Sequence, residues 1–152
     1  MNKIKTTRNS ETIMTEVVCP NDTNPMGILL GGKLVQWMDI ASAVCAQNHA
    51  EQICVTASIG MVNFKASATL GEIITVKAKV TRAFKTSMEI GVKVWSKKVL
   101  EKNKRLINEA YFTFVAIDEN ASPVAVPGLK PLTAEEKSEY QAAGKRKENK
   151  KI

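Results

Sequence analysis

Strict alternation of apolar and polar residues runs through three long stretches of this chain. In residues 72–82 the apolar positions are Ile74, Val76, Ala78 and Val80, and the same period continues through residues 87–95 and 105–117. A period of two is typical of strands that bury one face. Residues 11–18 alternate more loosely, and residues 53–64 are rich in β-branched and small side chains. The pattern therefore predicts a β-rich protein with five strands.

A helix is predicted between the first two strands, and its apolar side chains spread around the whole circumference. They are Leu34, Val35, Trp37, Met38, Ile40, Ala41 and Val44. We therefore expect other parts of the protein to cover this helix on nearly every side and to bury Asp39 in its middle. An unpaired buried carboxylate is costly, so Asp39 predicts a partner, a cavity or a chemical role. A structural hydrogen-bonding role or a place at a subunit contact are the alternatives.

The links between the strands decide how they pair. Residues 83–86 and 97–104 are short polar links, which predict antiparallel neighbours. A long antiparallel sheet that curls around one central helix is the economical arrangement, an α+β fold. Such a sheet leaves part of the helix bare, so we predict that a second copy covers it in a dimer.

Length, charge and composition narrow the possibilities. The 152 residues are enough for one domain, which we place at residues 1–131, followed by a charged tail at residues 132–152. Residues 134–152 hold six Lys or Arg against four Glu, and we expect them to form a frayed, solvated tail. The remaining excess of the +7 net charge lacks interleaved aromatic residues, so a small phosphorylated ligand fits better than nucleic acid. No stretch predicts a membrane span or signal peptide, and we expect a cytoplasmic protein.

The three cysteines and the single histidine offer little chemistry. Cys19, Cys45 and Cys54 lack metal-site spacing and are expected to be buried reduced thiols. Cys45 and His49 are four residues apart, but His49 lies where the helix ends. We expect a histidine whose charge is favoured by the helix dipole rather than a Cys–His pair.

Two glycines begin the predicted helix and expose its first amide groups. A turn-rich stretch, residues 20–27, precedes Gly31 and Gly32. Unshielded N–H groups at a helix N-terminus suit a developing oxyanion. Asp39 lies about two helical turns further on, or roughly 10 Å.

Six short motifs in register resemble the hotdog-fold acyl-CoA thioesterases, in the branch of the bacterial YciA-type and cytosolic acyl-CoA hydrolases. They are DTNPMG at 22–27, GG at 31–32, WMD at 37–39, VTAS at 55–58, VTRAFKTSME at 80–89 and AYFTFVA at 110–116. The resemblance covers most of residues 17–118 and implies a hotdog fold. It implies a hydrolase of fatty acid metabolism that converts acyl-CoA to CoA and a fatty acid without a metal or other cofactor.

The resemblance also implies the roles of particular residues. Asn24 of one protomer and Asp39 of the partner subunit would form the active site, with Asp39 as general base or nucleophile and Asn24 orienting water or the carbonyl. Gly31 and Gly32 would stabilise the oxyanion. The implied CoA contacts are Thr56, Ala57, Ser58, Arg82, Lys85, Thr86 and Ser87. The implied assembly is a homohexamer, a trimer of dimers, without nucleic acid or membrane partners.

Two other functions remain open from the sequence. A hotdog dehydratase or hydratase would use a catalytic histidine, and the sole histidine lies at the wrong end of the helix. A non-catalytic acyl-CoA-binding protein would lack the base, whereas Asn24 and Asp39 are both present.

Overall fold

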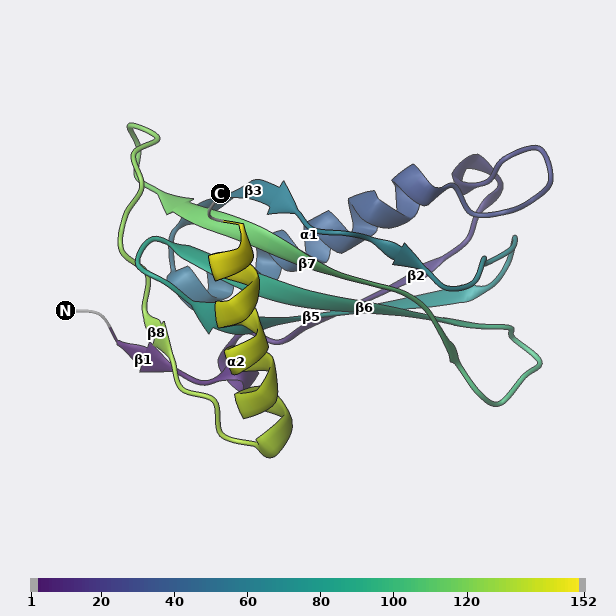
Figure 1. The fold of residues 1–152 in the computed structure, drawn as a ribbon. Coiled ribbons are helices and arrows are strands. Elements are labelled where there is room, and N and C mark those ends of the chain that lie inside the picture. Colours follow the sequence, from purple (N-terminus) through teal and green to yellow (C-terminus); the bar gives the residue numbers. More distant parts are fainter. Residues whose placement is uncertain (1–2, 151–152) are drawn as a thin grey trace.

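The computed structural model describes residues 3–150, in which one long antiparallel sheet curls around a central helix (Figure 1). Across the sheet the strand order is β2 (Thr12–Val17), β5 (Ile73–Ala83), β6 (Ser87–Lys97), β7 (Arg105–Ile117) and β3 (Ile53–Ile59). The short β4 (Asn63–Phe64) also pairs with β7. Helix α1 (Gly31–Ala50) packs on one face. The predicted hotdog architecture is confirmed.

Short elements complete the chain. Strands β1 (Ile4–Lys5) and β8 (Gly128–Leu129) form a separate parallel pair. Two 3₁₀ turns, η1 (Thr7–Asn9) and η2 (Pro20–Asp22), flank β2, and a second helix, α2 (Ala134–Asn149), ends the described part.

The sheet forms as the alternation predicts, because each long strand buries its apolar face. On β5, Ile74, Val76 and Ala78 are fully buried, whereas Lys77 and Lys79 on the outer face remain half-exposed. Helix α1 contacts β5, β6, β7, β3 and β2. The core therefore lies between α1 and the inner face of the sheet.

Helix α1 is covered on one face only. Its buried residues, Leu34, Trp37, Met38, Ala41, Ser42, Cys45, Ala46, His49 and Ala50, follow helical spacing. On the opposite side Ile40 is 45% exposed and Val44 is 41% exposed. The expectation that one chain covers the helix on nearly every side is wrong, and Asp39 is half-buried at the margin of the covered face.

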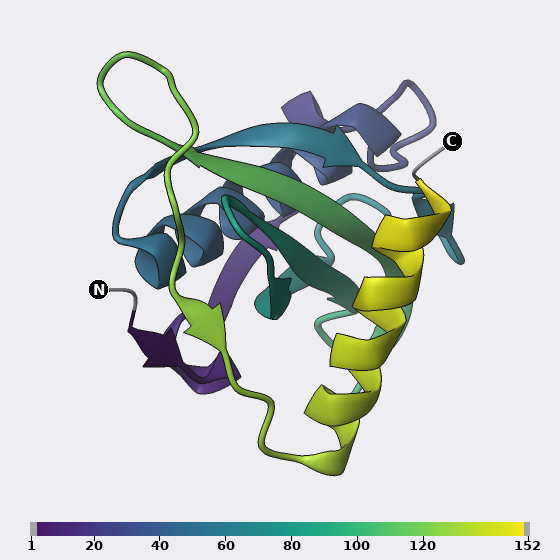
Figure 2. The same ribbon diagram turned by 60° about the vertical axis from the view of Figure 1, so that its left-hand side comes forward.

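The expected frayed tail is wrong: residues 134–149 form helix α2, which lies across the outer face of the sheet, opposite α1 (Figure 2). At its start, the Thr133 hydroxyl accepts a hydrogen bond from the Glu136 amide, and the Glu136 carboxylate accepts one from the Leu132 amide. This Thr-x-x-Glu pattern is a helix-start signal present in the sequence. The surplus of charge predicted a solvated segment, because the strands that pair with these charged residues are distant in sequence. The predicted boundary at residue 131 stays a prediction.

A partly buried ion pair attaches the last turns of α2 to the sheet. The Arg146 guanidinium donates from Nε and Nη2 to the two carboxylate oxygens of Glu89 on β6, at 2.8 and 2.7 Å. The Thr81 hydroxyl donates to Glu89 at 2.6 Å, and the guanidinium carbon of Arg146 lies 3.6 Å from the Tyr111 ring centroid. The ion pair raises the pKa of Arg146. Such a two-pronged contact fixes orientation as well as position.

A second contact explains a glycine inside α2. The Arg82 guanidinium lies 4.1 Å from the Tyr140 ring centroid, and its Nη1 donates to the Tyr140 carbonyl at 3.2 Å. A Cβ at position 144 would lie 2.5 Å from Arg82 Nη1. Gly144 weakens the helix relative to alanine, but it lets α2 approach the sheet this closely.

At the other end of the sheet, Glu72 joins three segments. Its carboxylate accepts hydrogen bonds from the Thr69 amide and hydroxyl and from the Ser96 hydroxyl, and pairs with Arg105 at 2.8 Å. Burial alone raises the pKa of this carboxyl, but these bonds outweigh it and lower the pKa to about 2. The charged form is therefore favoured in the folded protein.

We expect Glu72→Gln to lower the free energy of unfolding at pH 7 by about 2 kcal/mol, because it removes charge-assisted bonds to a buried group. The pKa of Glu72 is depressed on folding, so its contribution is complete above pH 4.5 and is lost as the pH falls towards 2. Urea unfolding at several pH values measures this. A difference from wild type that does not shrink below pH 4.5 would contradict the assignment.

Candidate functional site

The loop before α1 holds Asn24 in a fixed orientation. Asn24 Oδ1 accepts hydrogen bonds from the Met26 amide at 2.8 Å and the Ile28 amide at 3.1 Å. Two N–H donors require an oxygen at this position, which assigns the side-chain amide. The Nδ2 group is thus the end of Asn24 that can donate to a ligand.

Asp39 lies on the margin of α1 that faces the edge strand β3. The Thr56 hydroxyl on β3 donates to Asp39 Oδ1 at 2.7 Å. Two helical turns further on, Gln47 Oε1 accepts from the Cys54 amide at 3.2 Å, so a polar row of α1 follows this strand. Thr56, which is predicted as a CoA contact, thus orients the carboxylate; the CoA contact stays a prediction. Within residues 3–150, Asp39 Oδ2 has no protein hydrogen bond and can accept a proton.

A bulge in β3 separates the roles of Thr56 and Ser58. Thr56 pairs with Phe114 and Ser58 with Thr113, so Ala57 is the extra residue. Thr56 contacts α1, whereas Ser58 lines a cavity with Phe84, Ser87 and Lys147 on the side of α2. In a regular strand, residues two positions apart project to one face, so without the bulge both side chains would lie on the same side of the sheet.

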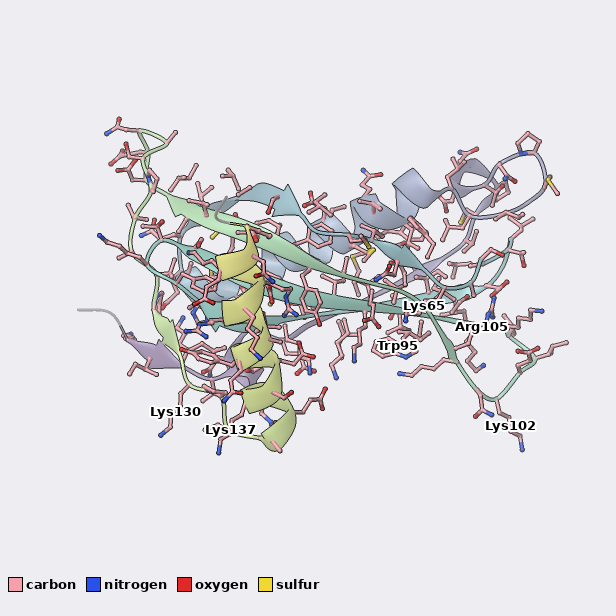
Figure 3. The ribbon with its side chains drawn as sticks, in the orientation of Figure 1. Lys65, Trp95, Lys102, Arg105, Lys130 and Lys137 are labelled. Atoms are coloured by element: carbon pink, nitrogen blue, oxygen red, sulfur yellow. The ribbon has the colours of Figure 1, made fainter. Side chains whose placement is uncertain are left out.

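Gly31 and Gly32 begin α1 as predicted, and the N-cap residue Leu30 gives no side-chain hydrogen bond. The Phe64 ring lies beside Gly31, where an added Cβ would contact it at 3.4 Å, while Gly32 is open. A cavity of about 300 Å³ here is lined by Gly31, Phe64, Ala66 and their neighbours. Lys65, another lining residue labelled in Figure 3, pairs with Glu109 on β7 at 3.8 Å.

The other predicted CoA contacts gather at the turn between β5 and β6. Arg82 packs against Tyr140, and Lys85 is exposed. The Ser87 carbonyl accepts a hydrogen bond from the Phe84 amide at 2.8 Å, which closes the turn. The Thr86 carbonyl accepts from the Ala116 amide at 3.0 Å. The structure thus places the candidates in three groups: the loop and start of α1, the Asp39–Thr56 pair, and the turn with Ser58 beside α2. The residues of α2 in the third group were missed from the sequence.

The cysteines and histidine do not form a nucleophilic pair. Burial raises the pKa of Cys45 to about 12 and that of Cys54 to about 11, so both thiols are protonated at neutral pH. His49 Nε2 donates to the Pro127 carbonyl at 2.8 Å, and burial lowers the pKa of this histidine. The expected dipole-favoured charge on His49 is therefore wrong. The expectation that Cys19 is buried is also wrong, because its position in the turn after β2 exposes it.

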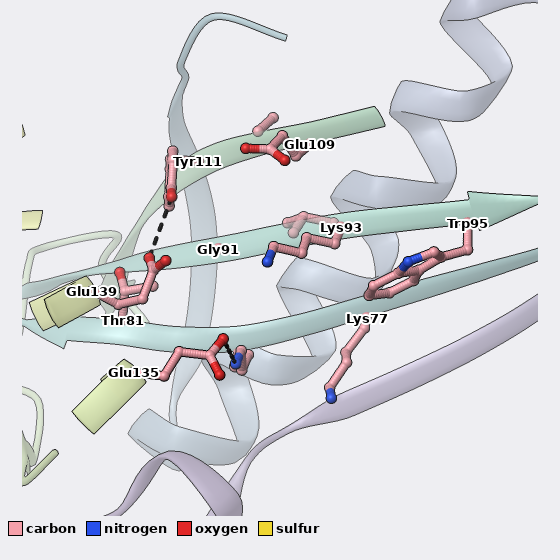
Figure 4. A pocket seen from close by; sticks show the side chains of 12 residues that line it. Lys77, Thr81, Gly91, Lys93, Trp95, Glu109, Tyr111, Glu135 and Glu139 are labelled. Carbon is pink, nitrogen blue, oxygen red and sulfur yellow. Dashed lines mark hydrogen bonds and ion pairs between the residues drawn. The ribbon is translucent and has the colours of Figure 1, made fainter. Parts of the chain in front are cut away.

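A cavity on the outer face of the sheet contains none of the candidate residues. Its volume is about 160 Å³, and Lys77, Lys93, Trp95, Glu109 and Glu139 are among its lining residues (Figure 4). Its charges have both signs, which favours no ligand class.

In the described part of the chain, no group of three His, Cys, Asp or Glu side chains is placed to hold a metal ion. None of the helices described is long and apolar enough to cross a membrane.

A curled antiparallel sheet around one central helix defines the hotdog class. The family model of the thioesterase superfamily matches residues 26–102. A crystal structure of an apo-hexameric acyl-CoA thioesterase has a TM-score of 0.93 at 41% identity, covering 97% of this chain and 94% of that one. The chain belongs to the thioesterase superfamily.

Two further relatives extend the comparison. An acyl-CoA hydrolase from Staphylococcus aureus, solved in complex with butyryl-CoA, CoA and CoA disulfide, has a TM-score of 0.91 at 34% identity, covering 97% of this chain and 90% of that one. Acyl-coenzyme A thioesterase 11 of Mus musculus is 38% identical over 138 residues, which is 91% of this chain. The chain spans 23% of the length of that mouse protein.

We expect a thiol-reactive dye to modify one thiol per chain rapidly, that of Cys19. Cys45 and Cys54 should react only after unfolding, because both are buried and protonated. Absorbance titration with and without denaturant measures this, and Cys19→Ser should abolish the rapid phase. A rapid phase that survives in this variant would contradict the assignment.

Proposed function

We propose that this protein is an acyl-CoA thioesterase that hydrolyses acyl-CoA to CoA and a fatty acid. The observation that carries the proposal is Asp39, held by the Thr56 hydroxyl at the margin between the core and an exposed apolar surface. A carboxylate oriented in this way beside apolar surface suits a reaction on an apolar acyl chain. The thioesterase and hydrolase names of the relatives support the same activity.

The proposed reaction needs a water molecule and two protein groups. Asp39 Oδ2 either takes a proton from the water that attacks the thioester carbonyl or attacks that carbon itself to form an anhydride that water then cleaves. The CoA thiolate leaves and is protonated. Asn24 Nδ2 donates to the carbonyl oxygen or holds the water, and the amides at Gly31 and Gly32 stabilise the oxyanion.

Solved variants of the S. aureus hydrolase support the choice of residues. In that protein an asparagine, an aspartate and a threonine were each replaced by alanine, at positions 15 and 17 residues apart. Asn24, Asp39 and Thr56 have the same types and the same spacing here. Their agreement in type and spacing favours one shared site.

The proposed active site needs a second subunit. Asn24 lies before the start of α1 and Asp39 lies two turns into it, so an extended helix separates the two within one chain. Ile40 and Val44 on the open side of α1, and Ile59 at the end of the edge strand β3, are exposed apolar residues. We propose that a second copy covers this surface and brings its Asn24 to Asp39, and that three such dimers form a hexamer in the cytoplasm. The hexameric relative supports the higher assembly.

The alternative activities find less support in the structure. A dehydratase of this fold would need a histidine near the substrate, whereas His49 is buried at the far end of α1 and is bonded to Pro127. A purely binding protein would not need an aspartate oriented by a hydroxyl.

We expect Asp39→Asn and Asn24→Ala each to lower kcat by about 100-fold or more, because each removes a group that acts on the reacting atoms. Thiol release from acetyl- to palmitoyl-CoA measures turnover, and circular dichroism checks the fold. Glu119→Gln, on an exposed turn, is the matched charge control. Near-normal turnover in Asp39→Asn would refute the role of Asp39, and no hydrolysis by wild type would refute the function.

We expect Val44→Glu to yield monomers without activity, because a charge in the apolar contact is left desolvated. Val99, in the turn between β6 and β7, is also exposed and apolar, so Val99→Glu is the control. Light scattering gives the mass of both variants. A Val44→Glu protein with the mass of wild type would show that this side of α1 is not the contact.

A further inference from the structure

The turn between β6 and β7 projects beyond the rest of the sheet and carries two apolar side chains at its end (Figure 1). The Glu101 amide donates to the Lys98 carbonyl at 3.0 Å, so Val99 and Leu100 occupy the two central positions of a tight turn. Val99 is 63% exposed and Leu100 is 98% exposed. Gly, Pro, Asn, Asp and Ser are the usual residues of such turns. Two adjacent apolar side chains at this tip therefore indicate a surface that meets something apolar.

Lysines flank the tip on both sides. Lys97 and Lys98 precede the two apolar residues, and Lys102 and Lys104 follow them. With Glu101 as its single carboxylate, the turn carries a net charge of +3. In the described part of the chain, none of the four lysines forms an ion pair with a carboxylate. The tip is therefore surrounded by a basic collar whose charge is left for another molecule.

A tryptophan lies at the base of the same hairpin. Trp95 is half-exposed on β6, and the Lys104 ammonium lies 4.4 Å from its ring centroid. Figure 3 shows Trp95 and Lys102 at this end of the sheet. Tryptophan is enriched at the boundary between membrane and water, because its ring is apolar and its N–H group is polar. The apolar tip, the basic collar and the tryptophan thus follow the order of acyl chains, headgroups and water in a bilayer.

We propose that this turn docks the protein on an anionic lipid surface. Val99 and Leu100 enter the boundary between headgroups and acyl chains, and Lys98 and Lys102 contact the headgroup phosphates. The charge of the collar complements an anionic surface. The family resemblance implies no membrane partner, so this inference departs from that expectation.

The shape of the turn favours lipid over a second copy of the chain. A stable contact between proteins buries about 800 Å² on each partner, and its centre is poor in charge. The tip offers two apolar side chains at the end of a narrow hairpin with lysines around them. The exposed side of α1 at Ile40 and Val44 is better suited to a contact between copies.

Docking of this kind would bring the protein to the place where long acyl chains gather, since each methylene adds to their partition into a bilayer. This consequence rests on the proposed function, whereas the docking itself does not.

Sedimentation with vesicles tests the apolar tip. We expect wild type to bind vesicles of equal parts phosphatidylglycerol and phosphatidylcholine, and to bind pure phosphatidylcholine at least tenfold more weakly. The double variant Val99→Ser, Leu100→Ser should lower the affinity for the anionic vesicles about tenfold or more. Leu132, before the start of α2, is 52% exposed, so Leu132→Ser is the matched control and should bind like wild type.

A second pair of variants tests the basic collar. Lys98→Gln together with Lys102→Gln should lower the affinity for the anionic vesicles about tenfold or more, because each lysine near the surface contributes separately. The control removes the same charge from Lys130 and Lys137, which are exposed at the other end of the molecule (Figure 3). Lys130→Gln with Lys137→Gln should lower the affinity less than threefold.

Circular dichroism and turnover of acetyl-CoA check each variant, and both should match wild type, because the turn lies outside the proposed active site. Equal binding of wild type to the two kinds of vesicle, or unchanged binding in either tip or collar variant, would overturn the inference. So would a smaller mass of the Val99→Ser, Leu100→Ser protein in light scattering, which would make the tip a contact between copies. A wild type that binds anionic vesicles through the turn but hydrolyses no thioester would uphold this inference and refute the proposed function.

Discussion

The position of the candidate site depends on the fact that the sheet covers only one face of helix α1. A sheet of this width can bury one face of a central helix, and the residues of the other face stay at the surface unless something else meets them. Asp39 lies at the boundary between the buried face and the exposed face of α1. It is close enough to the sheet to be held by Thr56 and close enough to the open side to meet a ligand. A fully buried carboxylate would have lost access, and a fully exposed one would have lost its orientation.

The strands and the first helix could be predicted from the sequence because their signals are local. The alternation in residues 72–82 and 105–117 depends only on neighbouring positions, and the strands form there. The degree of burial of Asp39 could not be predicted. An apolar residue on a helix can be covered by its own chain or by another one, and the sequence pattern is the same in both cases. The contact between Asp39 and Thr56 joins residues 17 positions apart, and it depends on the packing of β3 against α1.

The second helix shows a different limit. Its charges suggested a solvated segment, yet Arg146 meets Glu89 across 57 positions of sequence. A count of charged residues contains no information on which of them pair, because Arg146 and Glu89 meet only in the folded chain. The Thr-x-x-Glu pattern of Thr133 and Glu136 is a local signal for the start of the helix, and the charge of the segment does not contain this signal. The roles proposed for Asn24 and Asp39 rest on resemblance to a family, and the structure adds the hydrogen bonds that orient each side chain.

The extra residue at Ala57 gives the edge strand two working faces. Because the strand bulges here, Thr56 projects towards the aspartate beside the core and Ser58 projects towards the cavity on the side of α2. The bulge therefore matters as much as the identity of these residues. A homologue in which the same three residues formed a regular strand would keep every side chain named in the site and still direct one of them to the wrong side of the sheet.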